Sequence, residues 1–417
     1  MADRWAPRVG LAYVLAILAF TVAGVLASWS VPGLRVWPGP IGEDGYSGIW
    51  SVLGWIGLVV LGYAAWLKEF TTRQGWMLVA VALWLGATAL SMVIHGDLAD
   101  ARFWDFTAIG SGLVAGAALA TPSTVRATML GLGWFFGWGS IMAGVSDMFF
   151  DWPRVLVPED RFVRWVRMLG VDVDTFGALS GVTPGRVYVG LTCGLLLVYT
   201  VRTLLAGDHP RWMWVSCVGL TLAPLWALSR TGGVIIVLGL LAPLVPWERF
   251  RIGWLLASVF GVILLPLSLS WWLSGRAISD GTTAWRFDLW LDYLSRPGMW
   301  TPFGIGPQPF SLAYADHAHH QVLEAFATGG WVGLGGIVAF IALGTAAAHQ
   351  SAQWDARAAI AVVFGMAAIF QVDVVTMANR YATINIAFVL IVTVVVNAAA
   401  SPPHPRLLRK SPDPLDR

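Results

Sequence analysis

The chain has 417 residues, of which 57% are hydrophobic and 12% are charged, and its formal net charge is +2. A mean hydropathy of +0.69 is typical of a protein that crosses a membrane many times and excludes a soluble multidomain enzyme. The small net charge gives no indication of nucleic-acid binding, and no such partner is expected. We therefore predict one all-helical membrane domain over residues 1–417.

Apolar runs recur that are long enough to cross a hydrocarbon core, which takes about 20 helical residues. We predict twelve spans, near 9–29, 48–67, 75–95, 105–121, 127–148, 183–203, 212–229, 231–246, 252–272, 320–346, 357–376 and 382–400. The range 212–246 also fits a single hairpin. The first run follows Arg4 and Arg8 and directly precedes further spans, so we interpret it as an uncleaved signal anchor.

Positive charge is in excess in the segments that lie inside if both termini are cytoplasmic, which favours this orientation. The only two lysines, Lys68 and Lys410, are then inside, and residues 401–417 form a cytoplasmic tail. Two long loops, 149–182 and 273–319, are expected on the outer side. The predicted location is a bacterial inner membrane.

The first outer loop, 149–182, contains DRFVRWVRMLG, in which arginines alternate with apolar residues at helical spacing. This pattern predicts an amphipathic helix that lies on lipid headgroups. In a second interpretation, Arg164 and Arg167 form a basic wall that guides an anionic lipid.

The second outer loop, 273–319, contains WRFDLWLDYLSRPG, where Trp285, Leu289 and Tyr293 form an apolar stripe at four-residue spacing beside Arg286. The sequence GIGPQPF that follows predicts a turn that leads back to the membrane. A loop of this length is more often a binding element than filler, so we predict that it belongs to the active site.

Two further places carry charge in or beside predicted spans. In ALSRTGG, Ser229 and Arg230 interrupt an apolar hairpin, and an arginine there needs water, a carboxylate or a bound anion. The alternative is that Arg230 snorkels to the outer headgroups. In QVDVVTMANR, Asp373 and Arg380 have a structural interpretation, in which Asp373 pairs with an arginine across the bundle.

The sequence HAHHQVLEAFATGGWVG places His317, His319 and His320 at the mouth of a predicted span. Imidazole titrates near neutral pH, so this cluster is suited to proton transfer. Helix capping is the structural alternative for one or two of these histidines. Three imidazoles also suggest a metal site, but no cysteine or second histidine cluster lies nearby. Cys193 and Cys217 are interpreted as small core residues.

These motifs together resemble the bacterial O-antigen ligases and O-antigen polymerases, which are lipid-carrier-dependent glycosyltransferases of the C type. The resemblance is carried by SRTGG, WRFDLW, the GIGP turn and the histidine motif. The ligase pattern has His followed by Asn, Ser or Gln, then nine residues and Gly-x-x-Gly. Here His319, Gly330 and Gly333 match this pattern, and His320 departs from it.

The resemblance implies a metal-independent, inverting transfer without a cofactor. The donor would be a glycan on undecaprenyl diphosphate, and the acceptor would be lipid A-core for a ligase or another lipid-linked glycan for a polymerase. His319 would be the catalytic base, while the planar guanidinium groups of Arg230 and Arg286 would bind the diphosphate. His317 and His320 would support His319, by orienting it or by contacting sugar.

Two other function classes fit parts of the sequence. A metal-dependent transferase would use carboxylates in outer loops, such as Glu43–Asp44, Asp172 and Asp174. A lipid or solute transporter would line its path with Arg230 and Asp373. The absence of an evident internal repeat, and the clustering of the polar candidates on one predicted side of the membrane, weigh against transport.

Overall fold

The computed structural model describes residues 2–30, 48–96, 101–150, 156–157, 178–179, 186–205, 211–227, 229–241, 289–306, 320–350 and 386–399. Its helices are α1 (Ala2–Ser30), α2 (Gly48–Leu67), α3 (Thr72–His95), α4 (Ala101–Leu119), α5 (Pro122–Phe150), α7 (Arg186–Leu205), α8 (Trp214–Trp226), α9 (Arg230–Leu241), α13 (Gln321–Gln350) and α15 (Ile386–Ala399). Each predicted span contains one of these helices, except 252–272 and 357–376, which lie outside the described residues.

Length and apolar composition make four of the described helices able to cross a membrane. They are Thr72–His95, Pro122–Phe150, Val187–Leu205 and Gln321–Gly344. The exposed side of α2 is apolar along its length, and its large exposed side chains are Val52, Trp55, Ile56, Leu58, Val59, Tyr63 and Trp66. Such a face suits lipid and not water. The prediction of an all-helical membrane protein is confirmed at this level.

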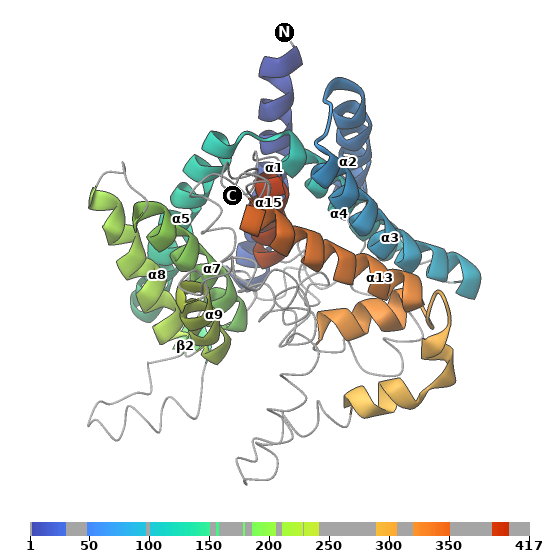
Figure 1. Cartoon of the computed structure of the whole chain (residues 1–417). Coiled ribbons are helices and arrows are strands. Elements are labelled where there is room, and N and C mark those ends of the chain that lie inside the picture. Colours follow the sequence, from blue (N-terminus) through green and yellow to red (C-terminus); the bar gives the residue numbers. More distant parts are fainter. Residues whose placement is uncertain are drawn as a thin grey trace, which may run out of the picture.

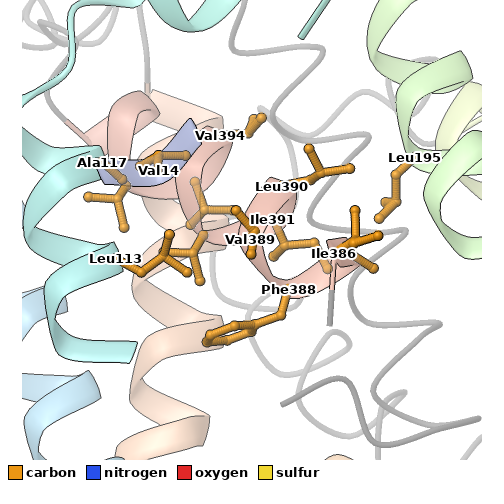
Figure 2. Close-up of a cluster of buried hydrophobic side chains, with 14 of the residues drawn as sticks. Val14, Leu113, Ala117, Leu195, Ile386, Phe388, Val389, Leu390, Ile391 and Val394 are labelled. Carbon is orange, nitrogen blue, oxygen red and sulfur yellow. The ribbon is translucent and has the colours of Figure 1, made fainter. Parts of the chain in front are cut away.

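The short helix α15 lies at the centre of the bundle (Figure 1), where it contacts α1, α3, α4, α5, α7 and α13. Every residue of α15 is buried. Figure 2 shows its valine, leucine and isoleucine side chains among Val14 of α1, Leu113 of α4 and Leu195 of α7. This apolar centre joins the helices on both sides of α15 into one core.

Polar side chains join helix ends that the predicted topology places on the same side of the membrane. Lys68 Nζ and Gln74 Nε2 both donate to Ala118 O, at 2.9 and 3.2 Å. Asn397 Nδ2 donates to Ala120 O at 2.9 Å. These carbonyls at the end of α4 have no partner within the helix, so the side chains satisfy them. The ends of α2, α4 and α15 and the start of α3 therefore meet.

The base of the first outer loop is closed by two short strands, β1 (Leu156–Val157) and β2 (Ala178–Leu179), which pair antiparallel. The carboxylate of Asp147, near the end of α5, accepts the Leu156 N–H at 2.7 Å. The predicted amphipathic helix, with Arg164 and Arg167, lies outside the described residues.

Both cysteines of the chain are free thiols, and both are buried, Cys193 in α7 and Cys217 in α8. Their interpretation as small core residues is confirmed. The Sγ atom of Cys193 points at the Phe136 carbonyl of α5, at 3.6 Å, where the two helices pack closely.

The helix α13 is sharply bent at Gly330, whose φ of 58° and ψ of −152° are not helical. A Cβ atom built on Gly333 would lie 2.5 Å from Ala325 O, whereas eight residues of straight helix rise about 12 Å. The chain therefore folds back at Gly330 (Figure 1). This bend interrupts the predicted span 320–346 and also Gln321–Gly344, which suits a membrane span by length and composition alone. The residues after Gly330 pack along α3.

Candidate active site at the start of α13

His320 caps the first turn of α13. Its Nδ1 atom accepts the Leu323 N–H at 3.3 Å, and its main-chain carbonyl accepts the Glu324 N–H at 2.9 Å. The first N–H groups of a helix lack partners within it, and Asn and Ser are the usual side chains that supply them. His320 therefore provides the acceptor that Asn or Ser most often provides at the start of a helix. The capping alternative is confirmed for this histidine.

The cap fixes the protonation of the His320 ring. A backbone N–H only donates, so Nδ1 carries no proton and the neutral ring has its proton on Nε2. Burial lowers the pKa of His320 from 6.5 to about 4, and a backbone hydrogen bond opposes this shift only in part. His320 lies just before the candidate span Gln321–Gly344 and is only 4% exposed. It is neutral at physiological pH, and its burial does not suit contact with sugar.

The end of the second outer loop packs on this first turn. Residues 289–295 are helical, and the Trp290 indole meets the His320 ring edge to face, with ring centroids 5.2 Å apart and planes at 85°. Trp290 belongs to a separate hydrophobic cluster, which consists of Leu289, Trp290, Tyr293, Met299, Phe326 and Ala327. The predicted stripe is confirmed for Leu289 and Tyr293, which are buried, and Trp285 lies outside the described residues.

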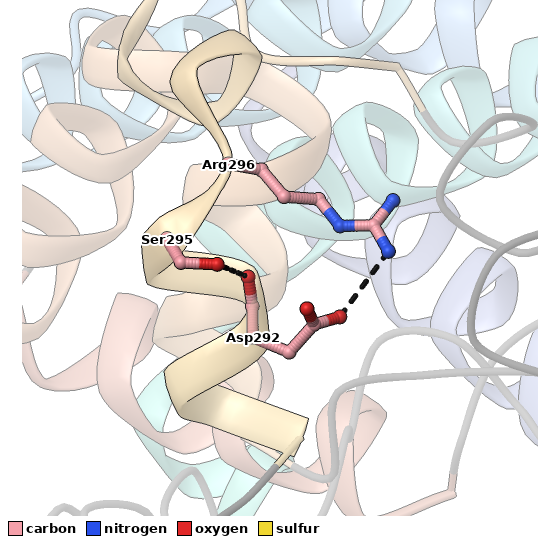
Figure 3. A network of polar contacts seen from close by, with 3 residues as sticks. All are labelled: Asp292, Ser295 and Arg296. Atoms are coloured by element: carbon pink, nitrogen blue, oxygen red, sulfur yellow. Dashed lines mark hydrogen bonds and ion pairs between the residues drawn. The ribbon is translucent and has the colours of Figure 1, made fainter.

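The solvent-exposed side of helix 289–295 carries an ion pair (Figure 3). Arg296 donates to the Asp292 carboxylate at 3.2 Å, and Ser295 Oγ donates to the Asp292 carbonyl at 2.7 Å. A solvent-exposed pair of this spacing contributes about 0.3–0.5 kcal/mol. Because Arg296 has a carboxylate partner, we assign it no ligand role.

The turn after this helix inserts into the bend of α13. Gly304 and Gly306 have positive φ values of 68° and 86°, so the predicted GIGP turn is confirmed for its described residues. Three main-chain hydrogen bonds join the turn to the bend: Ile305 N–H to Ala327 O at 2.9 Å, Val332 N–H to Pro302 O at 3.1 Å and Trp331 N–H to Thr301 O at 3.3 Å. The backbone groups that the bend releases thus find partners in the turn, as apolar surroundings require.

His95, the last residue of α3, also holds this turn. Its Nε2 atom donates to Gly304 O at 3.0 Å, and Thr301 Oγ1 donates to the same carbonyl at 3.0 Å. Sequence reasoning missed His95 because a lone histidine at the end of a predicted span forms no motif. The only sequence signal for a residue in the place of His95 was the GIGP turn, because the carbonyls of such a turn need hydrogen-bond donors from a neighbouring element.

The SRTGG motif forms the start of α9. Helix α8 ends at Trp226, and Arg230 is the first residue of α9, so the predicted interruption is confirmed. Ser229 Oγ accepts the Gly232 N–H at 3.2 Å, which caps the helix. Glycine can bend a backbone, but Gly232 and Gly233 both lie inside a regular helix. A Cβ on Gly232 would lie 2.7 Å from Gly190 Cα, so this glycine serves close packing on α7 instead.

The remaining predicted site residues lie outside the described residues: His317, His319, Arg286, Arg164, Arg167, Asp373 and Arg380. Arg230 is described by its place in α9. Among the residues that the structure does describe, no three His, Cys, Asp or Glu side chains are grouped to hold a metal ion. The described part of the site is thus the His320 cap, the Trp290 contact and the interlocked turn. No family model matches this chain, and a search of curated proteins finds no significant match.

Proposed function

We propose that this protein is a glycosyltransferase that moves a glycan from undecaprenyl diphosphate to an acceptor hydroxyl at the outer face of a bacterial inner membrane. The observation that carries the proposal is the packing of helix 289–295 on the first turn of α13 through Trp290 and His320. Arg286 lies four residues before Trp290 in sequence, and His319 immediately precedes His320. One structural unit therefore joins the two segments that carry these motifs.

The proposed reaction uses the residue types of these motifs. The His319 imidazole takes the proton of the acceptor hydroxyl as its oxygen bonds to the anomeric carbon. The bond from that carbon to the diphosphate oxygen breaks, and undecaprenyl diphosphate leaves with its electron pair. Arg230 and Arg286 bind the diphosphate oxygens and stabilise their growing charge. The transfer is inverting and needs no metal ion, and His317 supports His319.

A lipid-linked donor suits a membrane-embedded enzyme. The described helices present apolar side chains outward, as on α2, and a polyprenyl chain in the bilayer reaches the protein through this environment. In the proposed arrangement, twelve spans place both termini in the cytoplasm and both long loops outside. Arg164 and Arg167 line the lipid side of the first loop, while Asp373 and Arg380 stabilise the bundle.

Between the two acceptors, we favour lipid A-core, so the proposed enzyme is an O-antigen ligase. The spacing from His319 to Gly333 follows the ligase pattern. The structure adds that Gly330 stands where α13 bends and that Gly333 lies against Ala325 O, positions at which a Cβ atom has no space. An O-antigen polymerase, which extends a lipid-linked glycan, is the second candidate.

Two experiments test the proposal. Purified protein in lipid nanodiscs should release undecaprenyl diphosphate from a lipid-linked glycan only when an acceptor is present. Deletion of the gene should alter the surface glycan of the source cell in a way that separates the candidates. Polymer that stays on the lipid carrier indicates a ligase, and single repeat units indicate a polymerase. A deletion strain with normal glycans would oppose both.

A further inference from the structure

We propose that His320 and Trp290 are positioning residues that hold helix 289–295 on the first turn of α13, and that glycan transfer depends on this contact. This inference rests on the proposed function.

The His320 side chain has two roles. Its Nδ1 atom binds the Leu323 N–H, while its ring meets the indole of Trp290. Asparagine would supply the acceptor without the ring, and phenylalanine would supply a ring without the acceptor. Only an aromatic side chain with an acceptor nitrogen does both. The capping contact and the aromatic contact are therefore separable by substitution.

Helix 289–295 is held at two points. The Trp290 contact holds its beginning, and the turn that follows the helix is hydrogen-bonded to the bend at Gly330. Trp290 is 6% exposed, and Tyr293, one turn later, is fully buried. Loss of the Trp290 contact would free the end nearer to Arg286 in sequence while the other end stays attached.

His320 and Trp290 are each close in sequence to a residue with a proposed function, His319 and Arg286 respectively. One peptide bond joins His320 to His319, so their Cα atoms are about 3.8 Å apart. Three residues separate Arg286 from Trp290. A displacement of about 1 Å between reacting groups lowers turnover by roughly a hundredfold. The contact thus acts on turnover through the relative placement of the two segments.

The test compares His320→Asn, His320→Phe, Trp290→Leu and Trp290→Phe in full-length protein, with two readouts. Hydrogen exchange of residues 289–295 reports the contact itself, without catalysis. We expect faster exchange in His320→Asn and Trp290→Leu, which lose one ring, and near wild-type exchange in Trp290→Phe. The Leu323 amide should stay protected in His320→Asn and exchange faster in His320→Phe.

The second readout is kcat and KM for a lipid-linked glycan donor, expressed per folded molecule. His320→Asn and Trp290→Leu should lower kcat by roughly 10- to 100-fold with little change in KM, and Trp290→Phe should restore most of it. Arg296→Ala is the matched control, because it removes an exposed ion pair with Asp292 at the end of the same helix. It should leave kcat near wild type.

The outcomes separate this inference from the proposed function. If the wild-type protein transfers no glycan from the lipid-linked donor, the proposed function fails. If the wild type is active and His320→Asn and Trp290→Leu both keep its kcat, the positioning role is overturned while the function stands. Unchanged exchange of residues 289–295 in both variants would overturn the contact.

Discussion

Gly304 lies with its backbone directly against that of Gly330, and both residues have a positive φ. A Cβ on Gly304 would overlap Ala327 O, and one on Gly330 would overlap Thr301 O. The outer-loop turn and the bend of α13 thus interlock at a point where neither chain has room for a side chain. Glycine is needed at each position for its φ and for its size.

Gly330→Ala should lower the stability of the protein by several kcal/mol, because it adds both φ strain and overlap with the turn. Gly335→Ala, in the same helix, is the control, since a Cβ there meets nothing within 4 Å. Thermal unfolding in detergent measures both. Equal melting temperatures for the two variants would show that the interlock contributes nothing to stability.

His319→Ala should fold normally and lose glycan transfer by roughly a hundredfold or more, as expected when a general base is removed. His317→Ala, two residues away, should have a smaller effect. Initial rates with a fixed amount of purified, folded protein give the comparison. A larger loss in His317→Ala than in His319→Ala would move the base to His317.

Arg230→Lys and Arg286→Lys should both cripple transfer although they keep the charge. Lysine offers a point donor where arginine offers a planar fork that matches phosphate oxygens. Both variants should bind polyprenyl diphosphate more weakly than the wild type and should bind uncharged polyprenol as well as it does. Wild-type affinity for the diphosphate in both variants would remove these arginines from the donor site.

Transfer should continue in excess EDTA, because the proposed diphosphate ligands are cationic side chains. The measurement is the initial rate before and after chelation, with added magnesium or manganese as the control. Activity that disappears with EDTA and returns with either ion would favour the metal-dependent alternative and its acidic residues, Asp172 and Asp174.

His320 should make the protein less stable in mild acid. Its pKa is about 4 in the folded state and 6.5 for the unperturbed side chain, so the unfolded chain binds more protons between these values. The contribution of the neutral His320 ring to the free energy of unfolding is complete above pH 6.5. This contribution falls by up to about 3 kcal/mol as the pH decreases towards 4. Unfolding measured from pH 7 to 4 should show a smaller loss in His320→Asn, which keeps a capping acceptor. Parallel curves for the two proteins would contradict the assignment.

Long apolar runs predicted the helical membrane fold, because a helix that crosses lipid needs about 20 mostly apolar residues. The interruption of α13 was harder to predict. Glycine is common in membrane helices, and the run around Gly330 is apolar on both sides. The bend depends on a partner, since the turn at Thr301–Gly306 supplies its backbone hydrogen bonds, and sequence alone does not place that turn.

The candidate site was also only partly predictable from the sequence. The HAHH motif indicated a site at His317–His320, but the role of each histidine depends on neighbours that are distant in sequence. Trp290 lies thirty residues before His320 and meets its ring. Likewise, the SRTGG sequence does not reveal that Gly190 of α7 lies against Gly232. Side-chain chemistry was readable, whereas pairings across elements were not.

The burial of Cys193 and Cys217 makes the wild-type chain a ready background for labelling, because these are its only cysteines. A thiol placed in the HAHH segment would be the only one accessible to a membrane-impermeant maleimide. Its reaction in intact cells, compared with that of a thiol placed at Lys410, would reveal on which side of the bilayer the histidines lie. No native cysteine needs to be removed first.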